Sequence, residues 1–433
     1  MAPKFRVDHA ALTDLGMRRA NNQDSISAPD AGCEVNGRGE VFMVADGMGA
    51  HAAGELASKL ATDCIPHAYR KLGDLPPQAA LRQAVQKANG LIHAKGQSSP
   101  EFQGMGTTSS CLLLLGDAAL VAHVGDSRVY RLRGGQLDQL TFDHSLVWEM
   151  AAASQTTADQ VPDCIPKNVI TRSLGPHNKV NVDLEGPHPL ADGDAFLICS
   201  DGLTGVVEDH LIGALVGAMP PEEAGQTLID LANLRGGPDN ISVVIARVDD
   251  ESEDSGSGAA PTAPSRFRGG LQRLALLASA SCLLAVFWFV SQRHGLGALL
   301  ASAGFGASAM VAWMQRGAAV STPAVSGSLG GPYGNGPYRT IDCEPGDAAA
   351  AALADVVEQL AELEHRDGAE PSPPVENWKP FQELRHKAIY AADTGDPAAA
   401  VIHYAAAIRE LMDQVRAGRT VDYDENRGDA ASS

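Results

Sequence analysis

Residues 41–46 read VFMVAD, and the turn GMG follows directly at 47–49. A run of strand-forming apolar residues thus ends abruptly in a carboxylate, Asp46. Three further apolar runs carry an acid at one end, namely VAHVGD with Asp126, FLICSD with Asp201, and ISVVIARV, which Asp239 precedes. A single Asp-Gly pair is most often an ordinary turn. Four acids attached to strongly apolar runs instead predict a cluster of carboxylates at one edge of a sheet.

Carboxylates packed this closely repel one another and raise each other's pKa unless a cation neutralises them. Oxygen ligands select Mg²⁺ or Mn²⁺ over zinc. A neighbouring glycine such as Gly47 allows a backbone carbonyl to approach an ion. The residues by themselves therefore predict a Mg²⁺ or Mn²⁺ site in a protein built from strands and helices.

Composition limits the alternatives. The chain has 433 residues, which predicts two or more units, and a formal charge of −20, which argues against a nucleic-acid partner. The seven cysteines form no CxxC pair, which favours a reducing compartment. The start MAPKFRVDHA has no apolar signal-peptide core, so the first part of the chain is expected in the cytosol.

Residues 1–249 alternate between strand-like and helix-like stretches and form the first predicted domain. Strands are predicted at 41–46, 110–116, 118–126, 128–133, 195–201 and 241–248, because apolar runs there are bounded by turn residues. Helical spacing of apolar residues predicts helices over 55–72 and 76–97. The Gly-Gly pair in LRGGQL (132–137) indicates a hairpin.

A flexible linker is predicted over 250–268, followed by one or two transmembrane helices within 269–316. The stretch 271–290 is close to the roughly 20 apolar residues that a membrane-spanning helix needs. The stretch 296–314 is weaker and rich in small residues, so an interfacial or re-entrant helix is the alternative there. Arginines outside the pair of stretches favour a hairpin with both flanks in the cytosol.

A second linker is predicted over 317–345, and a helical region over 346–418. Its helical stretches lie near 347–366, 377–393 and 397–416. The sequence AADTGDPAAAVIHYAAAIREL resembles half of a tetratricopeptide repeat, and a generic helical hairpin is the alternative. This region is expected to bind protein. The tail 419–433 is predicted to be disordered.

The first domain resembles the metal-dependent protein phosphatases (PPM) of the bacterial protein phosphatase 2C type. The resemblance rests on an ordered set of motifs between residues ~8 and ~248: TDLGMRRANNQDS (13–25), VADGMGAHAAGE (44–55), GMGTT (104–108), AHVGDSRVYRL (122–132), DHS (143–145), ITRSLG (170–175), CSDGLTGVV (199–207) and GGPDNISVVI (236–245). It implies an α+β fold, a four-layer α-β-β-α sandwich of two antiparallel sheets flanked by helices. The transmembrane helices and a small all-α C-terminal region would follow.

The resemblance also implies ligands for two Mn²⁺ or Mg²⁺ ions and a third, more weakly bound one. Asp46 matches the bridging carboxylate and Gly47 a carbonyl ligand of the second ion. Asp201 and Asp239 match the remaining carboxylates of the first ion, and Asp126 matches the third position. Hydroxide formed between the ions would attack phosphorus in line, without a covalent intermediate.

Further residues are implied around the ions. Arg19 matches the phosphate-binding arginine, whose fork suits two phosphate oxygens. Asp24 is kept from an acidic pair that holds a water bound to metal, whereas Gln23 stands in place of its glutamate. His51 is the candidate proton donor to the leaving group, because Met48 occupies the position where eukaryotic members carry histidine. A surface histidine at a helix start is the alternative reading of His51.

Two more histidines and a loop complete these expectations. His123 lies within a strand and is expected to pack away from Asp126 by alternation. His144 is expected to have a structural role. The segment 143–175 matches the family's variable flap, which is expected to help select protein substrates.

The predicted function is Mg²⁺- or Mn²⁺-dependent hydrolysis of phosphoserine and phosphothreonine in cytosolic proteins. The expected partners are phosphoproteins, Ser/Thr kinases and their substrates, and the membrane through 271–314, with no nucleic acid. The predicted location is the inner (cytoplasmic) membrane, with the catalytic domain and the C-terminal region facing the cytosol. A phosphoprotein-binding sensor without activity and a hydrolase of small phosphate esters are the alternative functions.

Overall fold

The computed structural model describes residues 5–30, 38–50, 52–162, 164–166, 168–250, 329–364, 375 and 377–430. These residues belong to one compact unit, which joins residues 1–252 to residues 325–433. The predicted transmembrane region 269–316, His51 and nearly all of the linker 250–268 lie outside the described residues. Within the described ranges, no helix combines the length and apolarity needed to cross a membrane.

Two antiparallel sheets form the centre of the unit. The first has the strand order β1 (Phe5–Asp14), β11 (Ile241–Asp250), β10 (Ala195–Cys199), β7 (Arg128–Arg133), β8 (Gln136–Gln139) and β12 (Arg339–Asp342). The second has the order β2 (Asp24–Ser27), β3 (Glu40–Met48), β5 (Ser109–Leu115), β6 (Ala118–Val124) and β9 (Asp183–Pro189), with β4 (Gly106–Thr107) paired to β3. Together the two sheets bring strands far apart in the sequence into one sandwich.

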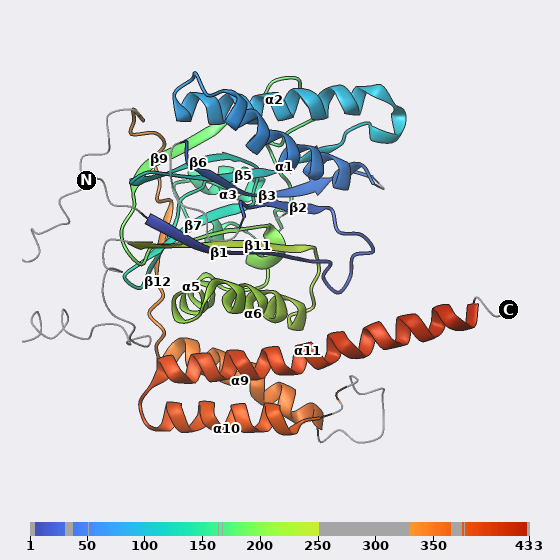
Figure 1. Cartoon of the computed structure of the whole chain (residues 1–433), viewed down its shortest axis with the longest axis vertical. Coiled ribbons are helices and arrows are strands. Elements are labelled where there is room, and N and C mark those ends of the chain that lie inside the picture. Colours follow the sequence, from blue (N-terminus) through green and yellow to red (C-terminus); the bar gives the residue numbers. More distant parts are fainter. Residues whose placement is uncertain are drawn as a thin grey trace, which may run out of the picture. The chain divides into compact units, whose positions relative to one another are not determined.

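Helices cover the outer faces of both sheets. The second sheet packs against α1 (Ala53–Lys71) and α2 (Pro77–Ser98), and the first packs against α5 (Asp209–Ala218) and α6 (Pro221–Leu234). Two short helices, α3 (Leu146–Ala153) and α4 (Asp201–Thr204), lie in the loops at the strand ends. Figure 1 shows these layers one above the other.

Alternation along the strands explains why the sheets stack. Phe42 and Val44 of β3 face the other sheet, where Phe196 and Ile198 of β10 meet them, whereas Met43 faces α1 and α2. Successive side chains of a strand point to opposite faces, so an apolar run is buried on both sides. The four-layer α-β-β-α sandwich expected from the sequence is confirmed.

The C-terminal region adds helices to this sandwich. They are α9 (Asp347–Glu364), α10 (Lys379–Asp393) and α11 (Pro397–Ala430). Their apolar residues join the same buried cluster as α5 and α6, and Figure 1 shows them against that pair. The helical region is thus packed on the catalytic sandwich.

Two predicted boundaries differ from the structure. Helix α11 continues to Ala430, into the segment predicted to be a disordered tail, because extending an existing helix requires no new nucleus. The predicted linker 317–345 contains β12, which pairs with β8. Its Gly/Pro-rich composition hides this strand, since the pairing depends on the edge that β8 offers. The strands β1, β2 and β9 and the helices α5 and α6 were also not predicted.

Candidate active site

The four predicted carboxylates converge at one end of the sandwich. Asp46 lies in β3, and Asp126 follows β6 after Gly125. Asp201 is the first residue of α4, two residues after the end of β10, and Asp239 precedes β11. Both sheets therefore supply ligand candidates to one place. Asp24 of β2 joins them, because it is paired with Asp46 across neighbouring strands.

Burial and mutual repulsion make ionisation of Asp24, Asp46 and Asp126 costly. Burial, and then the charges of Asp24 and Asp201, raise the pKa of Asp46 well above its usual range. Burial raises the pKa of Asp24 to about 7 and that of Asp126 to about 8. A bound cation would offset this cost, so the cluster has the electrostatics that a cation site requires.

Two buried oxygens support the same conclusion. Oδ1 of Asp126 and Oδ1 of Asp201 are buried and accept no hydrogen bond within the protein. Buried carboxylate oxygens are almost always satisfied, so an orphaned pair needs a missing partner. Hard oxygen donors of this kind suit Mg²⁺ or Mn²⁺.

Asp239 is held differently from the other carboxylates. Nη2 of Arg19 donates a hydrogen bond to Oδ2 of Asp239 at 2.6 Å, and this bond raises the pKa of Arg19. The guanidinium therefore occupies a place where a cation would bind. Over the described residues, no three His, Cys, Asp or Glu side chains are placed so that they could hold a metal ion together.

Gly47 is required by the close approach of two other segments. A Cβ atom added there would lie 2.1 Å from the carbonyl oxygen of Gly54 and 2.5 Å from that of Gln23. The Gly47 amide donates to the Gln23 carbonyl at 3.1 Å. Any larger residue would push β3 away from the start of α1, so Asp46 would move as well.

Hydrogen bonds from Thr108 and Ser200 hold Asp46 and Asp24. The hydroxyl of Thr108 accepts a hydrogen bond from the Asp46 amide at 2.8 Å, and the Thr108 amide donates to the Asp46 carbonyl at 2.8 Å. The Ser200 hydroxyl donates to Oδ2 of Asp24 at 2.8 Å. The motif GMGTT thus fixes the strand that carries Asp46, a role that the sequence alone did not assign.

Asn240 is a positioning residue that sequence reasoning noted only as part of a motif. Its Oδ1 accepts from the Gln23 amide at 2.8 Å, and its Nδ2 donates to the carbonyls of Leu15 and Asn21 at 2.9 and 3.1 Å. These bonds tie the loop that carries Arg19 to the start of β11. In the sequence, Asn240 stands directly after Asp239, but a role was predicted for Asp239 alone.

His144 clamps the turn that precedes Asp126. The His144 amide donates to the Gly125 carbonyl at 2.7 Å, and the Gly125 amide donates to Nδ1 of His144 at 2.9 Å. Nε2 of His144 donates to Oδ2 of Asp183 at 2.9 Å. His144 thus has the expected structural role: it hydrogen-bonds to both the amide and the carbonyl of Gly125.

His123 is buried beside this clamp, as the alternation predicted. It is 1% exposed and stacks on His144 with ring centroids 4.9 Å apart. Nε2 of His123 donates to the Phe142 carbonyl at 3.0 Å. His123 is therefore part of the support between β6 and the flap.

Comparison with known proteins places this site in a family. Residues 17–224 match the model of the family described as Protein phosphatase 2C. Protein phosphatase PhpP of Streptococcus pneumoniae is 35% identical over 254 residues, which cover 57% of this chain and 100% of PhpP. Serine/threonine protein phosphatase PstP of Mycobacterium tuberculosis is 37% identical over 246 residues, which cover 56% of this chain but 45% of PstP.

A solved structure agrees with these relatives. The crystal structure of the Mycobacterium tuberculosis serine/threonine phosphatase PstP/Ppp has a TM-score of 0.50 and 36% sequence identity, and the match covers 56% of this chain and 99% of that one. The residues matched by the family model, 17–224, lie within the sandwich and do not include the C-terminal helices. The chain belongs to the protein phosphatase 2C family and is a metal-dependent protein serine/threonine phosphatase.

Proposed function

We propose that the carboxylate cluster holds two Mn²⁺ or Mg²⁺ ions and that the site hydrolyses phosphoserine and phosphothreonine in proteins. The observation that supports this most strongly is the pair of orphaned buried oxygens on Asp126 and Asp201. Asp46, the Gly47 carbonyl, Asp201 and Asp239 would hold the two ions, and Asp126 would hold a third, weaker one. When bound, the ions supply hydroxide at neutral pH and neutralise phosphate charge.

The residues of the chain then have separate tasks. Asp46 is central because it lies between both sheets and has the other carboxylates around it. Asp24 keeps the surrounding water oriented, and the Ser200 hydroxyl fixes its rotamer. Gln23, in place of a glutamate, adds no further charge to a cluster that already repels itself.

Arg19 would bind the phosphate once Asp239 is engaged by a cation. Its side chain is half exposed and reaches the cluster from the loop that Asn240 holds. A planar guanidinium can donate to two phosphate oxygens and stabilise charge that develops on them. We assign proton donation to the leaving alkoxide to His51, which follows the turn after Gly47 in sequence.

The test uses the full chain, a phosphothreonine peptide and Mn²⁺. Turnover should require Mn²⁺ or Mg²⁺ and should be abolished in Asp46→Asn, which keeps the side-chain volume and removes the charge. Lys59→Gln serves as the matched control, because Lys59 lies on α1 and pairs with Asp63 at 2.9 Å on the surface. Phosphate release by the Asp46→Asn variant at the unmodified rate would overturn the proposal.

We further propose that the enzyme acts at the inner membrane, with its catalytic and C-terminal regions in the cytosol. The support is the apolar composition of 271–290 and 296–314. In this place it would oppose Ser/Thr kinases and act on their cytosolic substrates, while the C-terminal helices bind protein. Cell fractionation tests the location, since recovery of the full chain outside the membrane fraction without detergent would contradict it.

A further inference from the structure

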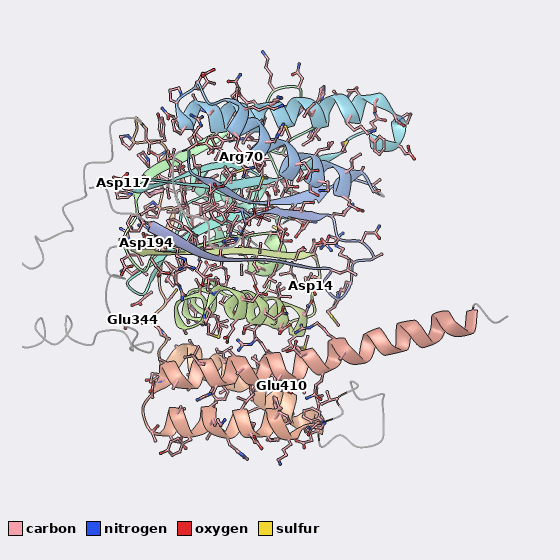
Figure 2. The ribbon with its side chains drawn as sticks, in the orientation of Figure 1. Asp14, Arg70, Asp117, Asp194, Glu344 and Glu410 are labelled. Carbon is pink, nitrogen blue, oxygen red and sulfur yellow. The ribbon has the colours of Figure 1, made fainter. Side chains whose placement is uncertain are left out.

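The segment 329–345, here called the strap, is built into the catalytic sandwich. Leu329 is 1% exposed within the cluster under α1 and α2. Further along, β12 adds a strand to the first sheet, with Arg339 opposite Gln139. A Cβ atom added to Gly213 of α5 would lie 2.5 Å from Cβ of Cys343. The strap thus contacts both helical layers, and Figure 2 labels Glu344 near its end.

One route of contacts leads from the strap to the flap through aromatic rings. Tyr338 packs edge-on against Phe142 with centroids 5.5 Å apart, and Phe142 packs edge-on against Trp148 at 5.3 Å. The Tyr338 hydroxyl donates to Oε1 of Glu185 at 2.6 Å, which fixes the ring. Phe142 therefore connects Tyr338 of the strap to Trp148 on α3.

A second route is ionic. Nη1 of Arg339 lies 3.3 Å from Oδ2 of Asp209, and Oδ1 of Asp209 accepts from the Tyr130 hydroxyl at 2.8 Å. The same Oδ1 lies 3.8 Å from Nη1 of Arg128. Arg128 also donates to Asp143 at 2.8 Å. Arg339 therefore helps to position the Asp209 carboxylate, which lies beside the Arg128 guanidinium.

The two routes meet at one cavity beside the metal centre. Arg128 and Trp148 both line it, and the Arg128 guanidinium lies 5.7 Å from the Trp148 ring centroid. The cavity has a volume of about 480 Å³, and the metal-ligand candidates Asp126 and Asp201 lie at its wall. A phosphorylated residue held at the ions would place its neighbours in the peptide here.

The charges of the cavity indicate what it accepts. Besides Arg128, the lining includes the carboxylates Asp126, Asp143 and Asp201. Arg128 pairs with Asp143 and lies near Asp209, and the proposed ions would neutralise Asp126 and Asp201, so the charges of the wall are compensated. Trp148 and Val147 provide an apolar wall. An apolar side chain of the peptide would therefore bind most favourably here, because burying its apolar area lowers the free energy. A charged side chain would lose its hydration.

We propose that this cavity binds an apolar side chain next to the phosphoresidue, a proposal that rests on the proposed function. Tyr338 and Arg339 of the strap would be the residues that position the wall of the cavity. The relatives' matches cover little more than half of this chain, and the family match ends at residue 224, before the strap. The strap would therefore give this enzyme a peptide preference that the sandwich alone does not set.

The test compares two phosphothreonine peptides, one with Leu and one with Gly after the phosphothreonine, and p-nitrophenyl phosphate as a small substrate. The full chain is assayed with Mn²⁺. We expect Tyr338→Ala and Arg339→Gln to lower the ratio of kcat/KM for the Leu peptide to that for the Gly peptide, and to that for p-nitrophenyl phosphate, by about three- to tenfold. Tyr338→Phe keeps the ring contact and should retain both ratios within about twofold.

Arg409→Gln is the matched control. Arg409 of α11 pairs with Glu223 of α6 at 2.6 Å and thus ties the same C-terminal region to the sandwich, away from the cavity. Melting temperatures show which variants fold, and Arg339→Gln carries the test if Tyr338→Ala does not fold. Unchanged ratios in the strap variants, or an equal fall in Arg409→Gln, would overturn the inference. Absence of turnover on all three substrates by the unmodified chain would instead refute the proposed function, and this inference with it.

Discussion

Arg19 and Asp239 form an ion pair at 2.6 Å, although the sequence assigns one to the phosphate and the other to a metal ion. A cation bound by Asp239, as proposed above, would compete with the guanidinium for the same carboxylate. Binding of the cation would release Arg19 towards the phosphate, so metal binding and substrate binding are linked through Asp239.

The first prediction concerns this competition. Arg19→Ala should lower kcat/KM for a phosphothreonine peptide by about 10- to 100-fold, because a charge-assisted contact to the phosphate is lost. The Mn²⁺ concentration for half-maximal activity should fall or stay the same, because Asp239 is released and a nearby positive charge is removed. A Mn²⁺ titration of both forms measures this, and a higher Mn²⁺ requirement in the variant would contradict the linkage.

The second prediction concerns metal removal. Mn²⁺ should raise the melting temperature of the chain over that in EDTA, because an ion that binds only the folded state stabilises it by mass action. In EDTA, Asp46→Asn should be more stable than the unmodified chain, since it removes a carboxyl whose pKa is raised by burial and by the charge of Asp24. The same variant should lose most of its response to Mn²⁺. Calorimetry with and without Mn²⁺ checks both signs.

The third prediction concerns the clamp on Gly125. His144→Gln can still reach Asp183 but leaves the Gly125 amide without its acceptor, whereas the oxygen of His144→Asn lies close to the place of Nδ1. We expect His144→Gln to lower the free energy of unfolding by about 1–3 kcal/mol, and His144→Asn to lower it less. Urea unfolding gives the comparison. Equal losses in the two variants would show that the acceptor at Nδ1 is not what matters.

The same pair of variants tests whether the clamp positions Asp126. His144→Gln should need more Mn²⁺ for full activity than His144→Asn, because the turn before Asp126 is loosened. A merely structural role would lower stability without moving the Mn²⁺ requirement. The assay is therefore run at a temperature at which both variants remain folded.

The fourth prediction concerns pH. Burial, and then the neighbouring His144, lower the pKa of His123 to about 3 from its usual 6.5. Below pH 6.5 the unfolded chain takes up a proton that the folded chain does not, so the stabilisation present above pH 6.5 is lost as the pH falls towards 3. Between pH 6.5 and pH 5 the loss is up to about 2 kcal/mol.

His123→Gln tests this contribution, because glutamine takes up no proton in this range. The free energy of unfolding of the variant should fall less steeply between pH 7.5 and pH 5 than that of the unmodified chain. His386→Gln, which alters an exposed histidine on α10, is the control and should leave the slope unchanged. Parallel curves for His123→Gln and the unmodified chain would exclude His123 as the source.

The local pattern of the sequence determined much of this protein. The apolar runs 41–46, 110–116 and 241–248 are strands in the structure, and the helical spacing over 55–72 and 76–97 corresponds to α1 and α2. The helices near 347–366, 377–393 and 397–416 were also predicted. These elements could be predicted because the spacing of apolar residues and the composition of a segment are read from that segment alone. The acids at the strand ends likewise indicated the site, because a carboxylate beside a buried apolar run is costly unless a partner neutralises it.

Tertiary structure decided what depends on distant segments. The sequence could not show that Arg19 pairs with Asp239, or that Asn240 ties down the loop around Gln23, because these contacts join residues more than 200 positions apart. The strap looked like a linker, since its Gly/Pro-rich composition carries no apolar period. Its order comes from the free edge of β8 and from the ring of Phe142, which exist only once the sandwich has formed. Local propensity fixes an element where its own residues suffice, and packing decides wherever the partner lies elsewhere in the chain.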